Sequence, residues 1–149
     1  MTVDTMQLLR FSRRFGKYYD RSFAPLLAEG LTLGEVHVLL FLANNPGCDT
    51  ARDVTELRGM SKSQVSQAVE LLVGRGFLAR QADREDRRVV HLEITPAGAP
   101  LAARAQDIQA ACACRLMEGL TPGEAEEFRR LLAKVFAQAD QLMKKEISE

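Results

Sequence analysis

Apolar side chains recur at steps of three or four residues through the first part of the chain, and this spacing predicts an amphipathic helix with an aromatic stripe. The stripe consists of Leu8, Phe11, Phe15, Tyr18, Tyr19, Phe23, Leu26 and Leu27. We expect this helix to end between Pro25 and Gly30, because proline and glycine both interrupt helices.

Two shorter helices are predicted next. Thr32 and Glu35 have the spacing of a capping box, which starts a helix that stops at 44–47, where asparagine, proline and glycine cluster. A short third helix begins near Thr50 and leads into a tight turn around Gly59. The residues of this third helix that we expect to face the core are Val54 and Leu57.

A fourth helix opens with another capping box, formed by Ser61 and Gln64. Its apolar positions share one face, namely Val65, Ala68, Val69 and Leu72. Two β-type segments follow at 77–80 and 89–94, and the polar segment 81–88 separates them. This order predicts a β-hairpin with an exposed, charged tip.

Two helices are predicted in the last third of the chain. Thr95 and Pro96 start the first of them, and Thr121, Pro122 and Glu124 combine three helix-start features for the second. The apolar residues of the last helix alternate steps of three and four, which is the spacing of a coiled-coil seam. This seam consists of Ala125, Phe128, Leu132, Val135, Ala139 and Leu142.

The order of these elements points to a DNA-binding fold. A short helix, a tight turn, a second short helix and a hairpin together form a winged helix-turn-helix, so we expect a mainly α-helical chain with a small β-hairpin wing. The outward face of the fourth helix carries small or amide side chains and one cation, but no carboxylate, as suits the major groove of DNA. The residues expected to contact DNA there are Ser61, Lys62, Ser63, Gln64, Ser66 and Gln67.

The tip of the hairpin adds cations that can reach a narrow minor groove. Arg84, Arg87 and Arg88 alternate with Asp83, Glu85 and Asp86 in this short stretch. Because all three carboxylates would repel phosphate if they faced it, we expect Asp86 to pair with a neighbouring arginine and to fix the shape of the wing. For an isolated loop the alternative is a merely solvated charge run.

Composition narrows the class of protein further. The 149 residues include 20 Lys and Arg against 20 Asp and Glu, which excludes a uniformly basic nucleic-acid coat but permits local basic patches. No apolar run reaches the roughly 20 residues that span a bilayer, and residues 1–4 do not resemble the start of a signal peptide. Three cysteines make no disulfide framework, so we expect a cytoplasmic protein without a membrane partner.

No catalytic or metal-binding arrangement is evident, so we expect no enzyme activity, cofactor or metal. Cys112 and Cys114 point away from each other on a helix and cannot share one ion. Cys48, in a loop, leaves open a thiol-based redox sensor or a thiol-dependent redox protein. His37 and His91 lie far in the sequence from any triad partner, and both are expected to be structural or solvated.

From Thr32 to Gly98 the chain resembles the MarR (multiple antibiotic resistance regulator) family. The matching segments are 61–66, 71–78, 83–88 and 92–98, and the terminal helices fit as well. The wing of that family is often written Asp-x-Arg-x-x-Arg, whereas here Glu85 holds the third position, which leaves Arg84 and Arg87 as the cations of the tip. The resemblance gives Asp86 and Arg88 the structural part of the wing.

The resemblance implies a homodimer that binds a pseudo-palindromic operator in double-stranded DNA, as a ligand-responsive repressor. The lobe 32–98 of the single domain 1–149 would bind DNA, and the helical regions 1–30 and 99–149 would form the dimer interface. The apolar stripes of the first and last helices support a dimer independently, although an intramolecular three-helix bundle is an alternative. A winged-helix module that binds a protein also remains open.

The family commonly has a small-molecule pocket between its dimer helices and its DNA-binding lobe. By this resemblance the residues expected to line it are Arg14, Tyr18, Tyr19, His37 and Phe41. For any single one of the aromatic residues, simple packing in the core is the alternative. An effector such as an aromatic acid would act by favouring a dimer whose recognition helices are wrongly spaced for DNA.

Overall fold

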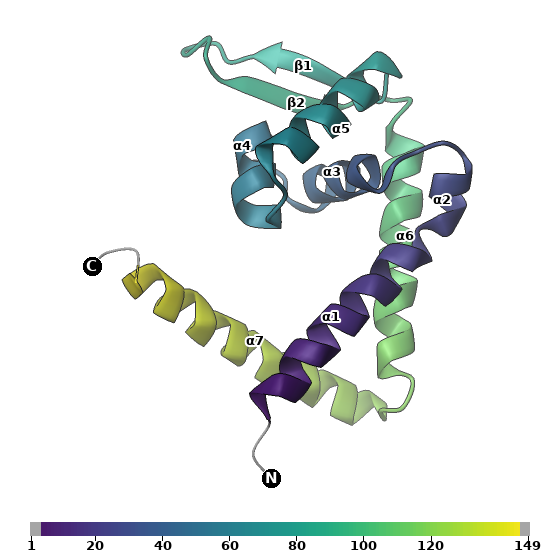
Figure 1. Cartoon of the computed structure of the whole chain (residues 1–149), viewed down its shortest axis with the longest axis vertical. Coiled ribbons are helices and arrows are strands. Elements are labelled where there is room, and N and C mark those ends of the chain that lie inside the picture. Colours follow the sequence, from purple (N-terminus) through teal and green to yellow (C-terminus); the bar gives the residue numbers. More distant parts are fainter. Residues whose placement is uncertain (1–3, 147–149) are drawn as a thin grey trace. The chain divides into compact units, whose positions relative to one another are not determined.

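A computed structural model describes residues 4–146 of the chain (Figure 1). Its elements, in order, are α1 (Thr5–Ser22), α2 (Ala24–Ala28), α3 (Leu33–Asn44), α4 (Ala51–Asp53), a π-helical turn (Val54–Arg58), α5 (Lys62–Gly74), β1 (Leu78–Ala82), β2 (Val90–Ile94), α6 (Ala99–Met117) and α7 (Pro122–Glu146). The fold is therefore mainly α-helical with one two-stranded hairpin, as predicted. The chain forms two compact units, Met1–Cys112 and Ala113–Glu149, and α6 crosses the boundary between them. The boundaries of these two units differ from those of the predicted DNA-binding and dimerisation regions, which stay a prediction. The outermost residues of the predicted dimerisation region, 1–3 and 147–149, lie outside the described part of the chain.

The predicted capping boxes are confirmed, and they explain where the helices start. At α3, the Thr32 N–H donates to a Glu35 carboxylate oxygen at 2.7 Å, and the Glu35 N–H donates to the Thr32 hydroxyl at 3.2 Å. The same reciprocal pair joins Thr121 to Glu124 ahead of α7. Each box provides side-chain acceptors for two backbone N–H groups that a helix start otherwise leaves unpaired.

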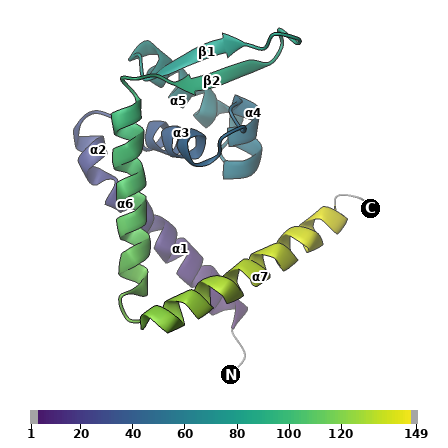
Figure 2. The same ribbon diagram turned by 180° about the vertical axis from the view of Figure 1, so that it is seen from behind.

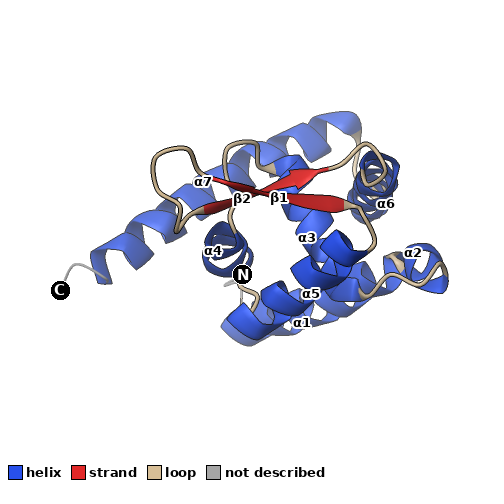
Figure 3. Cartoon of the chain, turned by 90° about the horizontal axis from the view of Figure 1, so that it is seen from above, coloured by secondary structure: helices blue, strands red, loops and turns tan. Residues whose placement is uncertain are grey.

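The core of the first unit is formed by α3, α5 and the hairpin, with α2 and the end of α1 beside them. Its fully buried side chains include Phe23 and Leu26, Val36 and Leu39 of α3, and Leu72 of α5. Figure 2, from behind, and Figure 3, from above, both show α5 and the hairpin next to each other. The register pairs Leu78 with Ile94 and Ala82 with Val90, and β1 begins shortly after the end of α5 at Gly74.

Three local details differ from the sequence-based expectation. The first helix ends before Phe23, and α2 begins at Ala24 with Pro25 in its first turn, because proline has no N–H with which to continue the hydrogen bonds of α1. Leu57, expected to face the core, is 66% exposed, since the π-helical turn changes the angle between successive side chains and leaves Val54 alone inside. In addition, α6 begins at Ala99 rather than at Thr95.

The corner between the hairpin and α6 is tightly packed at a glycine. Gly98 is buried, and a Cβ added to it would stand 2.2 Å from the carbonyl oxygen of Phe77. That oxygen already accepts the Thr95 N–H at 3.1 Å, and the Thr95 hydroxyl donates to the Gly76 carbonyl. The backbone of the hairpin start therefore touches the start of α6 at a place where only glycine fits.

Within residues 4–146, the helices are all too short or too polar to cross a membrane.

Candidate nucleic-acid interface

The helix α5 presents a polar face beyond its buried one. Val65 and Leu72 are buried against the core, and they hold the helix in place. The residues predicted to contact DNA are all exposed, namely Ser61, Lys62, Ser63, Gln64, Ser66 and Gln67. The first carboxylate of the helix, Glu70, pairs with Arg80 of β1. The exposed start of α5 is therefore free of acidic side chains, as a helix in the major groove requires.

Besides its predicted contact with DNA, Gln64 forms the capping box with Ser61 that the sequence spacing predicted. Its side-chain oxygen accepts the Ser61 N–H at 3.0 Å, while its own N–H donates to the Ser61 hydroxyl at 3.1 Å. This bond uses one of the two lone pairs of the amide oxygen and leaves the NH₂ donors available. Among the predicted base-reading residues, Gln64 thus also helps to start the helix.

The tip of the wing has two free cations and one fixed pair. Asp86 accepts the backbone N–H of Arg88 at 3.0 Å and pairs with its guanidinium at 3.1 Å, which confirms the expectation that Asp86 pairs with a neighbouring arginine. Arg84 and Arg87 are exposed, and no ion pair within residues 4–146 engages either guanidinium. The tip therefore presents two unpaired positive charges to any anionic partner.

His91 lies in a cluster with two aspartates. The sequence analysis predicted only that His91 is structural or solvated and gave no partner for it. His91 lies 2.7 Å from a carboxylate oxygen of Asp49 through Nδ1, and 2.7 Å from one of Asp83 through Nε2. These two hydrogen bonds raise the pKa of His91 above its ordinary value of 6.5. The hydrogen bond with His91, followed by those from backbone N–H groups of the tip, lowers the pKa of Asp83 to about 2. Because Asp49 is 42 residues away from His91 in the chain, sequence spacing gave no indication of this contact.

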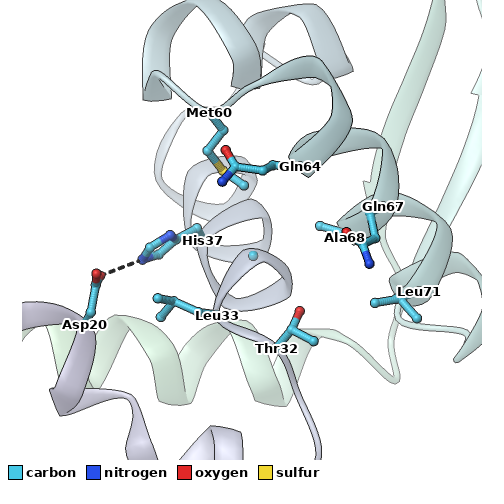
Figure 4. A pocket seen from close by; sticks show the side chains of 10 residues that line it. Asp20, Thr32, Leu33, His37, Met60, Gln64, Gln67, Ala68 and Leu71 are labelled. Carbon is cyan, nitrogen blue, oxygen red and sulfur yellow. Dashed lines mark ion pairs between the residues drawn. The ribbon is translucent and has the colours of Figure 1, made fainter.

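A pocket of about 400 Å³ lies between the end of α1, the start of α3 and the side of α5 that carries Gln64 and Gln67 (Figure 4). Its polar lining includes Asp20, His37, Gln64 and Gln67, with Met60 among the apolar residues. His37 Nε2 lies 3.2 Å from an Asp20 carboxylate oxygen, without the alignment of a hydrogen bond. Burial, and then the nearby Arg58, lower the pKa of His37, and these effects exceed the opposing one of Asp20.

Of the five residues predicted to bind a ligand, only His37 lines this pocket. Tyr19 is not in the lining, but it stacks on His37 with ring centroids 6.3 Å apart. Phe41 is buried in the core, whereas Arg14 and Tyr18 are exposed. The charged residue that sequence reasoning missed is Asp20, and among the described residues of the lining there is no lysine or arginine.

The cysteines do not form a cluster. Cys112 is buried, Cys114 is exposed and Cys48 packs, half-buried, against the core. Among residues 4–146, no group of three His, Cys, Asp or Glu side chains is arranged to hold a metal ion.

Comparison with known proteins places this geometry in context. The sequence pattern of the MarR family matches residues 29–89. The HTH-type transcriptional repressor Rv2887 of Mycobacterium tuberculosis is 30% identical over 112 residues, which cover 75% of this chain and 80% of the relative. The solved structure of transcriptional regulator PA3341 is 26% identical with a TM-score of 0.74, and the match covers 91% of this chain and 97% of that one. BpsR of Bordetella bronchiseptica, whose DNA binding is regulated by 6-hydroxynicotinic acid, is 26% identical with a TM-score of 0.67, over 87% of this chain and 98% of its own.

Proposed function

Since the chain belongs to the MarR family of transcriptional regulators, and is a DNA-binding regulator rather than an enzyme, we propose that it is a ligand-responsive repressor. It binds a pseudo-palindromic operator as a homodimer and acts in the cytoplasm, where the DNA lies. The observation that carries this proposal is the exposed start of α5, which offers amide, hydroxyl and ammonium groups and no carboxylate. The unpaired Arg84 and Arg87 of the wing supply the positive charge beside it.

The homodimer is supported by apolar faces that each unit leaves uncovered. In α1, Leu8, Leu9 and Phe11 are each more than half exposed. In α7, Val135 and Phe136 are exposed to a similar extent, and Val135 belongs to the predicted coiled-coil seam. Monomeric proteins rarely expose so many large apolar side chains, so a second copy of the chain is the natural cover.

Selection of duplexes from a random pool by the purified protein tests this proposal. We expect an inverted repeat whose half-sites lie about 34–36 Å apart, or a multiple of that distance. Affinity for the selected duplex should fall steeply with salt, and sedimentation should give twice the mass of the chain. A monomer that selects no sequence would contradict the proposal and favour the winged-helix module that binds a protein.

Gln64 provides a sharp test of base reading by α5. Gln64→Ala is expected to relax the preference at one operator position by about 1–3 kcal/mol. Gln64→Glu keeps the capping box, because glutamate is also a capping-box residue, but it places a carboxylate at the DNA surface. We therefore expect Gln64→Glu to lower operator affinity by about tenfold or more while the free energy of unfolding changes by less than about 0.5 kcal/mol.

Binding of each variant to a panel of single-base operator variants separates the two roles. A Gln64→Ala protein that keeps the full preference at every position would remove Gln64 from the base-reading set. If Gln64→Glu bound the operator as tightly as the parent, the start of α5 would not face DNA.

We place the effector in the pocket that Gln64 and Gln67 share with His37 and Asp20. A molecule there contacts the same helix that faces DNA, and so favours one position of that helix over another. Asp20 is the charged group of the lining, so its carboxylate repels an anionic group placed directly beside it, whereas the positive charge of Arg58, which also acts on His37, lies outside the lining. We therefore propose an aromatic effector that places a neutral or basic group beside Asp20, whereas the related BpsR responds to an acid.

A matched pair of probes tests the charge of the effector. We expect 6-hydroxynicotinamide to bind at least about fivefold more tightly than 6-hydroxynicotinic acid, because about 1 kcal/mol of repulsion from Asp20 is absent for the amide. Isothermal titration calorimetry of the DNA-free protein with each compound gives both affinities. In Asp20→Asn the difference should shrink, since the carboxylate is gone. Tighter binding of the acid to the parent protein would contradict the proposal.

A further inference from the structure

His91 lies between two carboxylates that belong to different parts of the first unit. Asp49 precedes α4, and Asp83 follows β1 at the base of the wing tip. Each ring nitrogen of His91 lies 2.7 Å from one of these carboxylates. A neutral imidazole has one N–H and can donate to only one of them, whereas the imidazolium has two and satisfies both. The geometry therefore fits the charged form of the ring.

Most of the other charged groups around His91 are carboxylates. Asp53 of α4 lies close enough for the positive ring to help lower its pKa, although its hydrogen bonds at Thr50 contribute more. Glu93 shares the His91 face of β2, and Glu85 and Arg84 of the tip line the same hollow. Arg84 is the one cation among these described neighbours, so the surroundings are acidic. The hydrogen bonds to Asp49 and Asp83 accordingly raise the pKa of His91 above 6.5.

The same two aspartates also hold the backbone on either side of His91, Asp83 through its carboxylate and Asp49 through its main-chain carbonyl. The second oxygen of Asp83 accepts the N–H groups of Glu85 and Asp86, each at 3.0 Å, and so shapes the turn that carries Arg84. On the other side, the Asp49 carbonyl accepts the Leu92 N–H at 2.7 Å. The protonated ring is thus a link between the wing tip and the segment that leads into the helix-turn-helix.

We propose that His91, as an imidazolium, is a positioning residue for DNA binding, which holds the wing tip against the segment before α4 and loses this hold when its proton leaves. The proposal rests on the proposed function, because it assumes that the wing arginines contact DNA. The sign follows from the raised pKa in the folded protein. The link is complete below the ordinary value and is lost as pH rises through the folded-state value.

Two measurements test the proposal. Titration of the imidazole resonances in the free protein, assigned with His91→Gln and His37→Gln, should give His91 a pKa above 6.5. Asp83→Asn should lower it, because an amide N–H facing Nε2 suits the neutral ring. Operator affinity of the parent should fall about three- to tenfold between about pH 6 and about pH 8.5, as for a pKa difference of half to one unit between free and bound protein. His91→Gln should lack this fall, whereas His37→Gln should keep it.

The outcomes separate this inference from the proposed function. If the parent binds the operator with the same pH profile as His91→Gln, or if His91 titrates at or below 6.5, the inference is overturned while the repressor function stands. If the parent binds no DNA at any pH, both are overturned, and the imidazole titration still decides whether the ring is held as a cation.

Discussion

Replacing both Arg84 and Arg87 by alanine is expected to lower operator affinity more than any other change to the wing. Each guanidinium is exposed and unpaired within residues 4–146, so each is available to phosphate or to a minor groove. A lost arginine contact costs about fivefold to 150-fold in affinity, which corresponds to about 1–3 kcal/mol. The slope of log affinity against log salt concentration should decrease by about two, one for each cation. Fluorescence anisotropy with a labelled operator at several salt concentrations measures both quantities.

The single variants and a charge-matched control complete this experiment. Arg84→Ala and Arg87→Ala separately identify which guanidinium lies closer to DNA. Arg130→Ala removes the same charge from α7, where the side chain pairs with Glu127, and should leave the salt slope unchanged. If the double variant bound the operator like the parent, the wing would not be part of the DNA interface.

Gly98→Ala is expected to give the largest loss of stability for the addition of a single methyl group. The new Cβ would stand 2.2 Å from the Phe77 carbonyl oxygen, a distance at which backbone has to move. Because that oxygen also accepts the Thr95 N–H, the shift disturbs the join between the hairpin and α6. Overpacking of a close-packed site costs about 1–3 kcal/mol or more, which chemical denaturation measures directly.

Gly74→Ala is the matched control, because the substitution is identical and the surroundings are open. No heavy atom lies within 4 Å of a Cβ added at Gly74, the last residue of α5. Alanine favours a helix over glycine by up to about 1 kcal/mol, so this variant should be as stable as the parent or more stable. A Gly98→Ala protein as stable as Gly74→Ala would show that the contact at Phe77 is not tight.

Local features of the sequence were sufficient to predict most elements of the fold. The capping boxes at Thr32 and Ser61 were foreseeable because their hydrogen bonds join residues only three positions apart. The buried face of α5 followed from its helical spacing, and the pairing of Asp86 with Arg88 followed from charge alternation over two residues. Where the interacting groups are neighbours in the chain, elementary physical chemistry determines the result.

The remaining features depend on contacts between distant segments or on unusual backbone. Asp49 and Asp83 meet at His91 only after the hairpin has folded back on the helix-turn-helix. The pocket needs Asp20 of α1 beside His37 of α3, and no periodicity relates these two positions. Leu57 was misplaced because a π-helical turn has no recognised sequence pattern in this segment, and an α-helical period was assumed instead.

Because the Gln64 side chain has three roles, it restricts how a repressor of this kind diverges after gene duplication. Gln64 begins a helix, lines a pocket and faces outward at the same time. A copy that acquires a new target sequence by changing this position also alters the stability of its own fold and its response to small molecules. Such a copy is expected to diverge first through the wing, where no ion pair within residues 4–146 engages Arg84 or Arg87, and only later through the helix.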